Sequence, residues 1–154
     1  MELQERLRSD LNSALKSGYK ERADFLRFIL AQLHNREIEK RSHSSEPVLG
    51  LTDEEVIGVL QKEAKKRKEA AEMFKKGGRQ DLAEREEREL ALINEYLPAQ
   101  MSHQEVEEEI SRLLAGGLSD FNSLMREAIK NLKNRADGRV VSDIIKKRLA
   151  GREQ

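Results

Sequence analysis

Residues 52–98 read TDEEVIGVLQKEAKKRKEAAEMFKKGGRQDLAEREERELALINEYLP, and they predict a long helical hairpin. Thr52 and Glu55 have the spacing of a capping box, in which each side chain binds the backbone N–H of the other residue. A long helix should follow and reach about Lys76. It should end there because Gly77-Gly78 can take the left-handed backbone conformation that terminates helices.

The second helix of the hairpin is expected at residues 81–96, because Pro98 cannot continue a helix. The glycine pair leaves a short connection, so the two helices should run antiparallel. Arg67 projects from the apolar stripe of the first helix and Glu86 from that of the second, at nearly the same height. We predict that Arg67 and Glu86 form a structural ion pair that fixes the register, since removing one partner would leave a buried charge. The alternative is a carboxylate poised for acid–base chemistry, which needs a cleft and a substrate.

Two further helices should precede this hairpin. Helical spacing of leucines predicts one at residues 2–17, which Gly18 ends. Residues 20–41 carry a wider apolar arc than one neighbouring helix can cover, so this helix should be central to a four-helix N-terminal domain. Residues 42–50 have no periodicity and should form a loop.

Three short helices should follow Pro98. Ser102 and Glu105 have the spacing of a second capping box. Apolar residues at helical spacing then form three stripes: Val106, Ile110, Leu113 and Leu114; Phe121, Leu124, Met125, Ala128, Ile129 and Leu132; and Val140, Val141, Ile144, Ile145 and Leu149. Strand-like alternation is absent from the sequence, so the fold class should be all-α. We expect an N-terminal domain at residues 1–98 and a small three-helix domain at residues 102–154.

The composition excludes several kinds of chemistry. The 154 residues contain no cysteine, which rules out disulfides, thiolate metal sites and cysteine nucleophiles. His34, His43 and His103 lack a second ligand at metal-binding spacing, so no metal site is expected. Neither glycine pair has the preceding strand, the spacing and the following Lys-Ser or Lys-Thr of a phosphate-binding loop. We therefore expect no catalytic residue and no cofactor.

No part of the sequence indicates export or membrane insertion. The N-terminus lacks the basic start and apolar run of a signal peptide. No window approaches the roughly 20 apolar residues that a membrane-spanning helix needs. We therefore expect a cytoplasmic protein.

Charge is distributed unevenly, although the formal net charge is zero. Residues 126–154 contain nine Lys and Arg and four Asp and Glu, a net charge of +5, so the rest of the chain carries −5. A basic end on an acidic body is typical of a segment that binds a polyanion. A turn at residues 134–138 would let backbone amides and basic side chains meet phosphates together. The candidate RNA-binding residues are Lys130, Lys133, Arg135, Asp137, Gly138, Arg139, Lys146 and Lys147.

The absence of aromatic residues from residues 126–154 indicates which kind of nucleic acid this segment would bind. Aromatic side chains do not alternate with its basic residues, so stacking on single strands is disfavoured. Recognition of the shape and backbone of folded RNA fits better. The alternative is a charged surface that only keeps the helices solvated.

Four stretches of the chain resemble the GatB/YqeY family, which shares the C-terminal part of the GatB subunit of tRNA-dependent amidotransferase. They are LQKEAKKRKEA at residues 60–70, GGRQDL at 77–82, EYLP at 95–98 and RADGRVVS at 135–142. The resemblance covers nearly the whole chain, and the YqeY branch is the most similar. It implies an all-helical fold with a larger N-terminal domain and a small C-terminal domain similar to the GatB tail.

The resemblance also implies a function. In GatB the tail helps to bind tRNA, while phosphorylation and amidation of the misacylated amino acid belong to other parts of the enzyme. The implied function is a non-catalytic tRNA-binding accessory protein, whose classification as a carbon–nitrogen ligase with glutamine as amido donor comes from homology alone. The alternative is a helical protein–protein interaction module of the translation or tRNA-modification machinery. Asn122 and Asn134 stand where the family usually has glycine, which would alter a close backbone contact with RNA.

Overall fold

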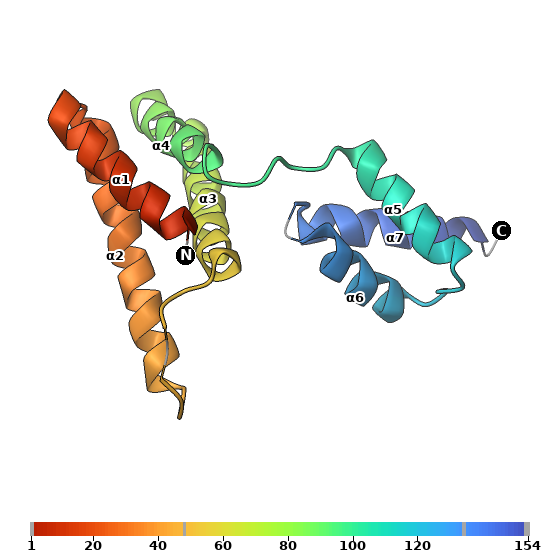
Figure 1. Cartoon of the computed structure of the whole chain (residues 1–154). Coiled ribbons are helices and arrows are strands. Elements are labelled where there is room, and N and C mark those ends of the chain that lie inside the picture. The colour runs from red at the N-terminus through yellow and green to blue at the C-terminus, as the bar shows by residue number, and fades with distance from the viewer. Residues whose placement is uncertain (1, 48, 134, 153–154) are drawn as a thin grey trace. The chain divides into compact units, whose positions relative to one another are not determined.

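The computed structural model describes residues 2–47, 49–133 and 135–152, and these residues form seven helices and no strand (Figure 1). The all-α prediction is therefore confirmed. The helices are α1 (Glu2–Ser17), α2 (Lys20–Ser42), α3 (Asp53–Lys76), α4 (Gln80–Asn94), α5 (His103–Ala115), α6 (Phe121–Leu132) and α7 (Gly138–Arg152). No helix within these ranges combines the length and the apolar character needed to cross a bilayer.

Tertiary contacts divide the chain into two compact units. Unit 1 is Met1–Leu97 and contains α1 to α4, and unit 2 is Pro98–Gln154 and contains α5 to α7. Each unit has an apolar core of its own. Independent folding of the two units stays a prediction.

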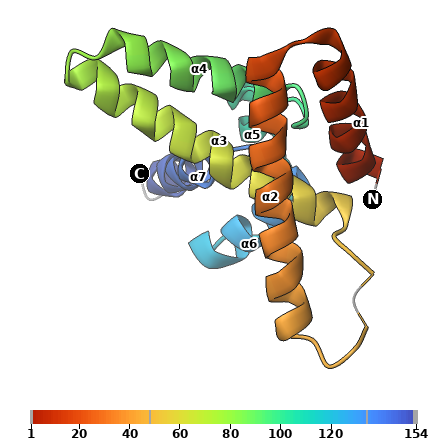
Figure 2. The same cartoon turned by 90° about the vertical axis from the view of Figure 1, so that its left-hand side faces the viewer.

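Unit 1 consists of two antiparallel helix pairs, α1 with α2 and α3 with α4 (Figures 1 and 2). Helix α2 packs against α1 and crosses α3, so two neighbouring helices cover its wide apolar arc. Helix α1 also contacts α3. Complete burial of each large aliphatic side chain contributes about 1.5–3 kcal/mol, so this core holds the two pairs together. Its most deeply buried members are Leu7, Leu26, Ile29, Leu33, Leu51, Val56, Leu60 and Ile93.

The α3–α4 hairpin begins and turns at the residues that the sequence indicates. Thr52 Oγ1 accepts the backbone N–H of Glu55 at 3.2 Å, and Glu55 Oε2 accepts that of Thr52 at 2.8 Å, so the predicted capping box is confirmed. Helix α3 ends at Lys76. Gly78 then has a φ of +73°, the left-handed conformation that lets the chain reverse directly.

Helix α4 ends at Asn94, two residues earlier than expected. The backbone N–H of Tyr96 bonds to the carbonyl of Ile93 rather than to a carbonyl four residues back, which marks a tighter final turn. Pro98 excludes Leu97 from the helix, because proline disfavours helical backbone angles in the residue before it. Tyr96 is nevertheless buried.

Lys40 anchors the segment that connects α2 to α3. Its ammonium group donates to Glu55 Oε2 at 2.7 Å and to the carbonyl of Gly50 at 3.1 Å. The hydrogen bond from Lys40 is the main reason why the pKa of Glu55 lies below its ordinary value. The loop is therefore tied to both helices at its α3 end.

Unit 2 is a bundle in which each of α5, α6 and α7 contacts the other two. Ser102 Oγ accepts the N–H of Glu105 at 3.2 Å, and Glu105 Oε2 accepts that of Ser102 at 2.7 Å, which confirms the second capping box. Ile129 and Val140, expected on the apolar stripes, are 49 % and 37 % exposed and lie outside the core. The buried core is Val106, Ile110, Leu114, Leu124, Ala128, Leu132, Val141, Ile144 and Ile145.

Thr52→Ala and Ser102→Ala should each destabilise one unit only. Each change removes the side chain that caps a helix N-terminus, a loss of about 1 kcal/mol. If the units fold independently, calorimetry should record two unfolding transitions, with Thr52→Ala lowering the midpoint of one and Ser102→Ala that of the other. A single transition lowered equally by both variants would contradict independent folding.

Candidate functional site

The predicted RNA-binding residues lie at the end of α6, in the turn after it and along α7. Lys130 and Lys133 belong to the last turn of α6 and its cap, and Arg139 belongs to the first turn of α7, so all three lie on either side of the connection between these helices. Arg135 is half-buried. The exposed members of the set are Lys130, Lys133, Asp137, Gly138, Arg139, Lys146 and Lys147.

None of the six cations in this set has a carboxylate partner in the part of the chain that the structure describes, and four of them make no ion pair, hydrogen bond or ring contact through their side chains there: Lys130, Lys133, Arg139 and Lys147. Unpaired surface cations are the groups that gain most from binding phosphates, because the phosphates then release their counterions. Lys146 is different, since its Nζ lies 5.9 Å from the centroid of the Phe121 ring. That cation–π contact is weak at an exposed site and leaves the charge accessible.

Arg135 has a structural partner that the sequence did not reveal. Its Nε donates to the carbonyl of Ala99 at 3.0 Å, and its own carbonyl accepts the N–H of Met101 at 2.7 Å. Arg135 therefore holds the segment before α5 against the turn before α7. A contact of this guanidinium with RNA stays a prediction.

Asp137 also has a structural role, as the residue that caps α7. Its Oδ1 accepts the backbone N–H of Arg139 at 2.9 Å, and its carbonyl accepts that of Val141 at 3.1 Å. A carboxylate at a helix N-terminus is stabilised by the unpaired N–H groups there. The same carboxylate partly offsets the positive charge of its neighbours.

Lys133 is the non-glycine residue with a positive φ, +46°, within the described ranges. A side chain in this left-handed conformation costs about 1–2 kcal/mol. The sequence directed attention to Asn134, which lies outside the described residues, and to Asn122, which is exposed in the first turn of α6. Strained residues of this kind concentrate at functional sites, so the exposed cation of Lys133 is a strong candidate for ligand contact.

In the hairpin of unit 1, Arg67 Nε lies 3.6 Å from Glu86 Oε2. Two further carboxylates, which sequence analysis missed, approach the same guanidinium. Glu89 Oε2 lies 2.8 Å from Arg67 Nε, and Glu63 Oε2 lies 3.3 Å from Arg67 Nη1. Helical spacing was the available signal, because Glu63 precedes Arg67 by four residues and Glu89 follows Glu86 by three.

This Arg67 cluster is mostly shielded from solvent. The side chain of Arg67 is 15 % exposed and that of Glu63 is 5 % exposed. Arg67 Nε, Glu63 Oε2 and Glu86 Oε2 have no aligned hydrogen bond among the described residues, so the contacts are mainly between charges. The ring of Phe28 lies 5.0 Å from Arg67 Cζ, which adds α2 to the cluster.

Charge balance favours a structural role for the Arg67 cluster. Lys66 Nζ lies 3.4 Å from Glu63 Oε1, and Arg85 Nε lies 3.9 Å from Glu89 Oε1, so three cations face three carboxylates. Within the described ranges, no three acidic or histidine side chains are arranged to hold a metal ion. The cluster therefore joins helices and offers no free base for chemistry.

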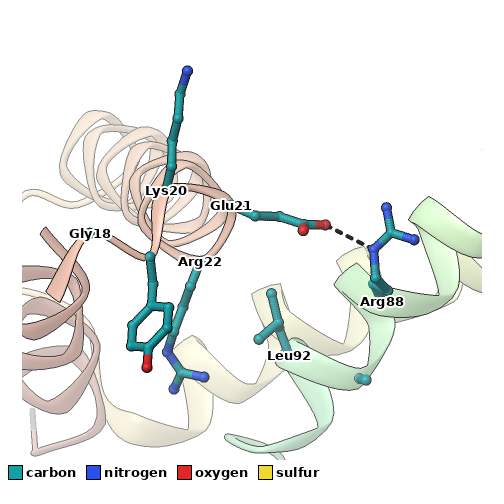
Figure 3. A pocket seen from close by; sticks show the side chains of 8 residues that line it. Gly18, Lys20, Glu21, Arg22, Arg88 and Leu92 are labelled. Atoms are coloured by element: carbon teal, nitrogen blue, oxygen red, sulfur yellow. Dashed lines mark hydrogen bonds and ion pairs between the residues drawn. The ribbon is translucent and has the colours of Figure 1, made fainter.

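A hollow of about 630 Å³ opens between the α1–α2 turn and α4 (Figure 3). Glu21 Oε1 accepts a hydrogen bond from Arg88 Nε at 3.1 Å beside it, as Figure 3 shows. Tyr19 is 66 % exposed, and a single aromatic residue after a helix-ending glycine carries no periodic signal in the sequence. The lining residues are Gly18, Tyr19, Lys20, Glu21, Arg22, Arg88, Ala91 and Leu92.

Tyr96 connects α1 and α2 to the chain that follows α4. Its hydroxyl donates to Asp10 Oδ2 at 2.5 Å and accepts from Arg22 Nη2 at 3.3 Å. Arg22 also pairs with Glu95 at 2.9 Å, and Arg6 Cζ lies 4.8 Å from the centroid of the tyrosine ring. Burial and the hydrogen bond to Asp10 raise the pKa of Tyr96 to about 12.

Known proteins resemble this chain over nearly its whole length. The profile of the family described as Yqey-like protein matches residues 4–149. An uncharacterised protein of Schizosaccharomyces pombe is 41 % identical over 101 residues, which are 66 % of this chain and 76 % of the relative. A Pyrenophora tritici-repentis protein named "Altered inheritance of mitochondria protein 41, mitochondrial" is 27 % identical over 150 residues, 94 % of this chain and 77 % of the relative.

Arg67→Met should destabilise unit 1 strongly, because it leaves three carboxylates together without their central cation. Removal of one partner from a buried ion pair typically costs about 3–5 kcal/mol. Urea unfolding followed by circular dichroism would measure the loss. Arg85→Met is the matched control, since Arg85 is 67 % exposed and should contribute below about 1 kcal/mol. Equal stability of the two variants would show that the Arg67 cluster does not hold the hairpin.

Tyr96 should make unit 1 less stable in strong alkali. Its pKa is raised from 10.0 to about 12, so its contribution is present below pH 10 and is lost as the pH rises toward 12. Absorbance at the phenolate wavelength in a Tyr19→Phe variant isolates the titration of Tyr96, because the chain has two tyrosines and no tryptophan. Asp10→Asn should move that titration to lower pH. A midpoint near 10 before this change would argue against the described environment.

Proposed function

The chain belongs to the YqeY-like protein family, and we propose that it is a non-catalytic accessory protein that binds tRNA through unit 2. The observation that carries the proposal is a group of four exposed cations at the end of α6 and along α7 that make no ion pair, hydrogen bond or ring contact through their side chains among the described residues, defined here as the unpaired set. It comprises Lys130, Lys133, Arg139 and Lys147. These residues can exchange solvent counterions for phosphates without breaking an existing ion pair.

The arginines of unit 1 provide the contrast. Arg22, Arg67 and Arg88 are all engaged with carboxylates of other helices or of the chain next to them. Binding RNA through these groups would first require those contacts to break. Lysines of α3 are exposed too, but they are distributed around the helix and do not gather at one turn.

The choice of tRNA as the RNA rests on the resemblance of unit 2 to the GatB tail. That resemblance includes Arg135 to Gly138, where the structure has the turn between α6 and α7. Classification as a carbon–nitrogen ligase comes to this chain through the same homology. We propose that the chain assists such a reaction and does not perform it.

We propose the cytoplasm as the place of action. The relative from Pyrenophora tritici-repentis is named as a mitochondrial protein, which makes the mitochondrion the alternative compartment. Localisation of a tagged chain in its own cells would decide between the two.

A protein-interaction module is the second candidate function. The hollow beside the exposed ring of Tyr19 favours it, because aromatic residues at the edge of an apolar surface are frequent anchors of protein interfaces. Such a partner would bind unit 1. The two functions are therefore separable by substitutions in different units.

Binding of purified protein to bulk tRNA, measured by fluorescence anisotropy at two salt concentrations, tests the proposal. Wild-type protein should bind at low salt and weaken as salt rises. Substitution of the unpaired set by alanine should reduce affinity at least tenfold and make the salt dependence shallower by about one unit of slope per cation removed.

The matched control changes four exposed lysines of α3, Lys62, Lys65, Lys68 and Lys76, to alanine. This variant has the same change in net charge and should keep most of the affinity. Equal loss in both variants would mean that overall charge, and not unit 2, attracts the RNA. Absence of tRNA binding by the wild-type chain at low salt would refute the proposed function and leave the interaction module.

A further inference from the structure

A small hollow of about 110 Å³ lies between the end of α6 and the start of α7. The described residues that line it are apolar or glycine: Ile129, Leu132, Ala136, Gly138 and Val141. Sites for drug-sized ligands are about 300–1,000 Å³, so this hollow is too small for one of them. An apolar cavity of about 150 Å³ binds one benzene ring, so a hollow of this size can receive part of a single flat ring.

In unit 2, one exposed apolar side chain lines the hollow, and another belongs to the sequence neighbour of a lining residue of α7. Ile129, which lines it, is 49 % exposed, and Val140, which precedes the lining residue Val141, is 37 % exposed. These are the large apolar side chains that stand exposed in the described part of unit 2. Apolar groups left in water around a concavity favour an occupant with an apolar face.

Three basic residues are direct sequence neighbours of the residues that line the hollow. Lys130, Lys133 and Arg139 each directly follow a residue that lines the hollow, and all three belong to the unpaired set. The backbone of Lys133 has a left-handed conformation, with a φ of +46°. An occupant should therefore combine a flat apolar ring with negative charges a short distance away.

A nucleotide has this combination, because its base is a flat ring and its phosphates are anionic. We infer that the hollow takes the unstacked base of one nucleotide while Lys130, Lys133 and Arg139 hold the phosphates on either side. The inference rests on the proposed function and specifies its substrate class. The RNA must offer an unpaired nucleotide, in a loop, a bulge or an end, since bases within a continuous helix are stacked and out of reach.

The lining also determines how selective the contact is. Among the described residues, no aromatic side chain lines the hollow, so the base is held by apolar packing and by shape. The described lining also offers no polar side chain to read the edge of the base. The contact therefore selects an unpaired nucleotide over a paired one, with little preference among the four bases.

Gly138 provides a substitution that adds a bulky side chain at the lining of the hollow and spares the cations. A Cβ atom added at Gly138 meets no protein atom within 4 Å, and this glycine has no positive φ, so Gly138→Leu should fold. Gly151 in the same helix has the same two properties and does not line the hollow. Gly151→Leu is therefore the matched control.

The test compares a stem–loop RNA with a blunt RNA duplex that has the same number of phosphates, by anisotropy at one salt concentration. Wild type and Gly151→Leu should bind the stem–loop roughly tenfold more tightly than the duplex, the scale expected when one base face of about 50–60 Å² is removed from water against apolar side chains. Gly138→Leu should bind both RNAs at the duplex level. A stem–loop with abasic loop nucleotides should lose the same preference with wild type.

The outcomes separate this inference from the proposed function. Equal binding of stem–loop and duplex by wild type would overturn the inference, keep RNA binding, and leave the hollow to a protein contact. A preference that persists in Gly138→Leu would also overturn it. Failure of wild type to bind any RNA would overturn the proposed function itself. Circular dichroism of Gly138→Leu, with an unfolding midpoint near that of Gly151→Leu, shows that this variant is folded.

Discussion

One guanidinium organises unit 1. Arg67 faces carboxylates from its own helix and from α4, and the ring of Phe28 from α2 covers it. A charge in this position tolerates little displacement, because moving α3 by one turn against α4 would separate it from its partners while leaving it shielded from water. The register of the hairpin follows from this constraint. Leu60 and Ile93 then meet in the same core as α2.

The sequence predicted the helices well because their ends are determined locally. Thr52 and Ser102 cap with their own side chains, and Gly78 reverses the chain through its own backbone. The end of α4 was less predictable, because it depends on the tertiary setting of Tyr96 as well as on the proline. Glu63 and Glu89 escaped notice because acidic residues are abundant on these helices, and only packing shows which of them face inward.

The sequence predicted which basic residues belong to the candidate site, but it did not predict which contacts each of them makes. Net charge identified the basic segment, yet it cannot separate a cation that holds the chain from one that faces solvent. Arg135 donates to the carbonyl of Ala99, a long-range contact without a spacing signal in the sequence, and Asp137 caps α7, a role typical of an Asp directly before a helix. The small hollow was also hidden, because Ile129 and Val140 fit an apolar stripe while standing outside the core.

The position of Tyr96 has a mechanical consequence. A pull on the chain at Pro98 would enter unit 1 through a residue that is bonded to Asp10 of α1 and to Arg22 of α2. The load would therefore be shared by three helices instead of peeling α4 from its end. Hydrogen bonds loaded side by side resist separation better than bonds that break one after another. Unit 1 should therefore resist unfolding when a force is applied to the chain that follows residue 97.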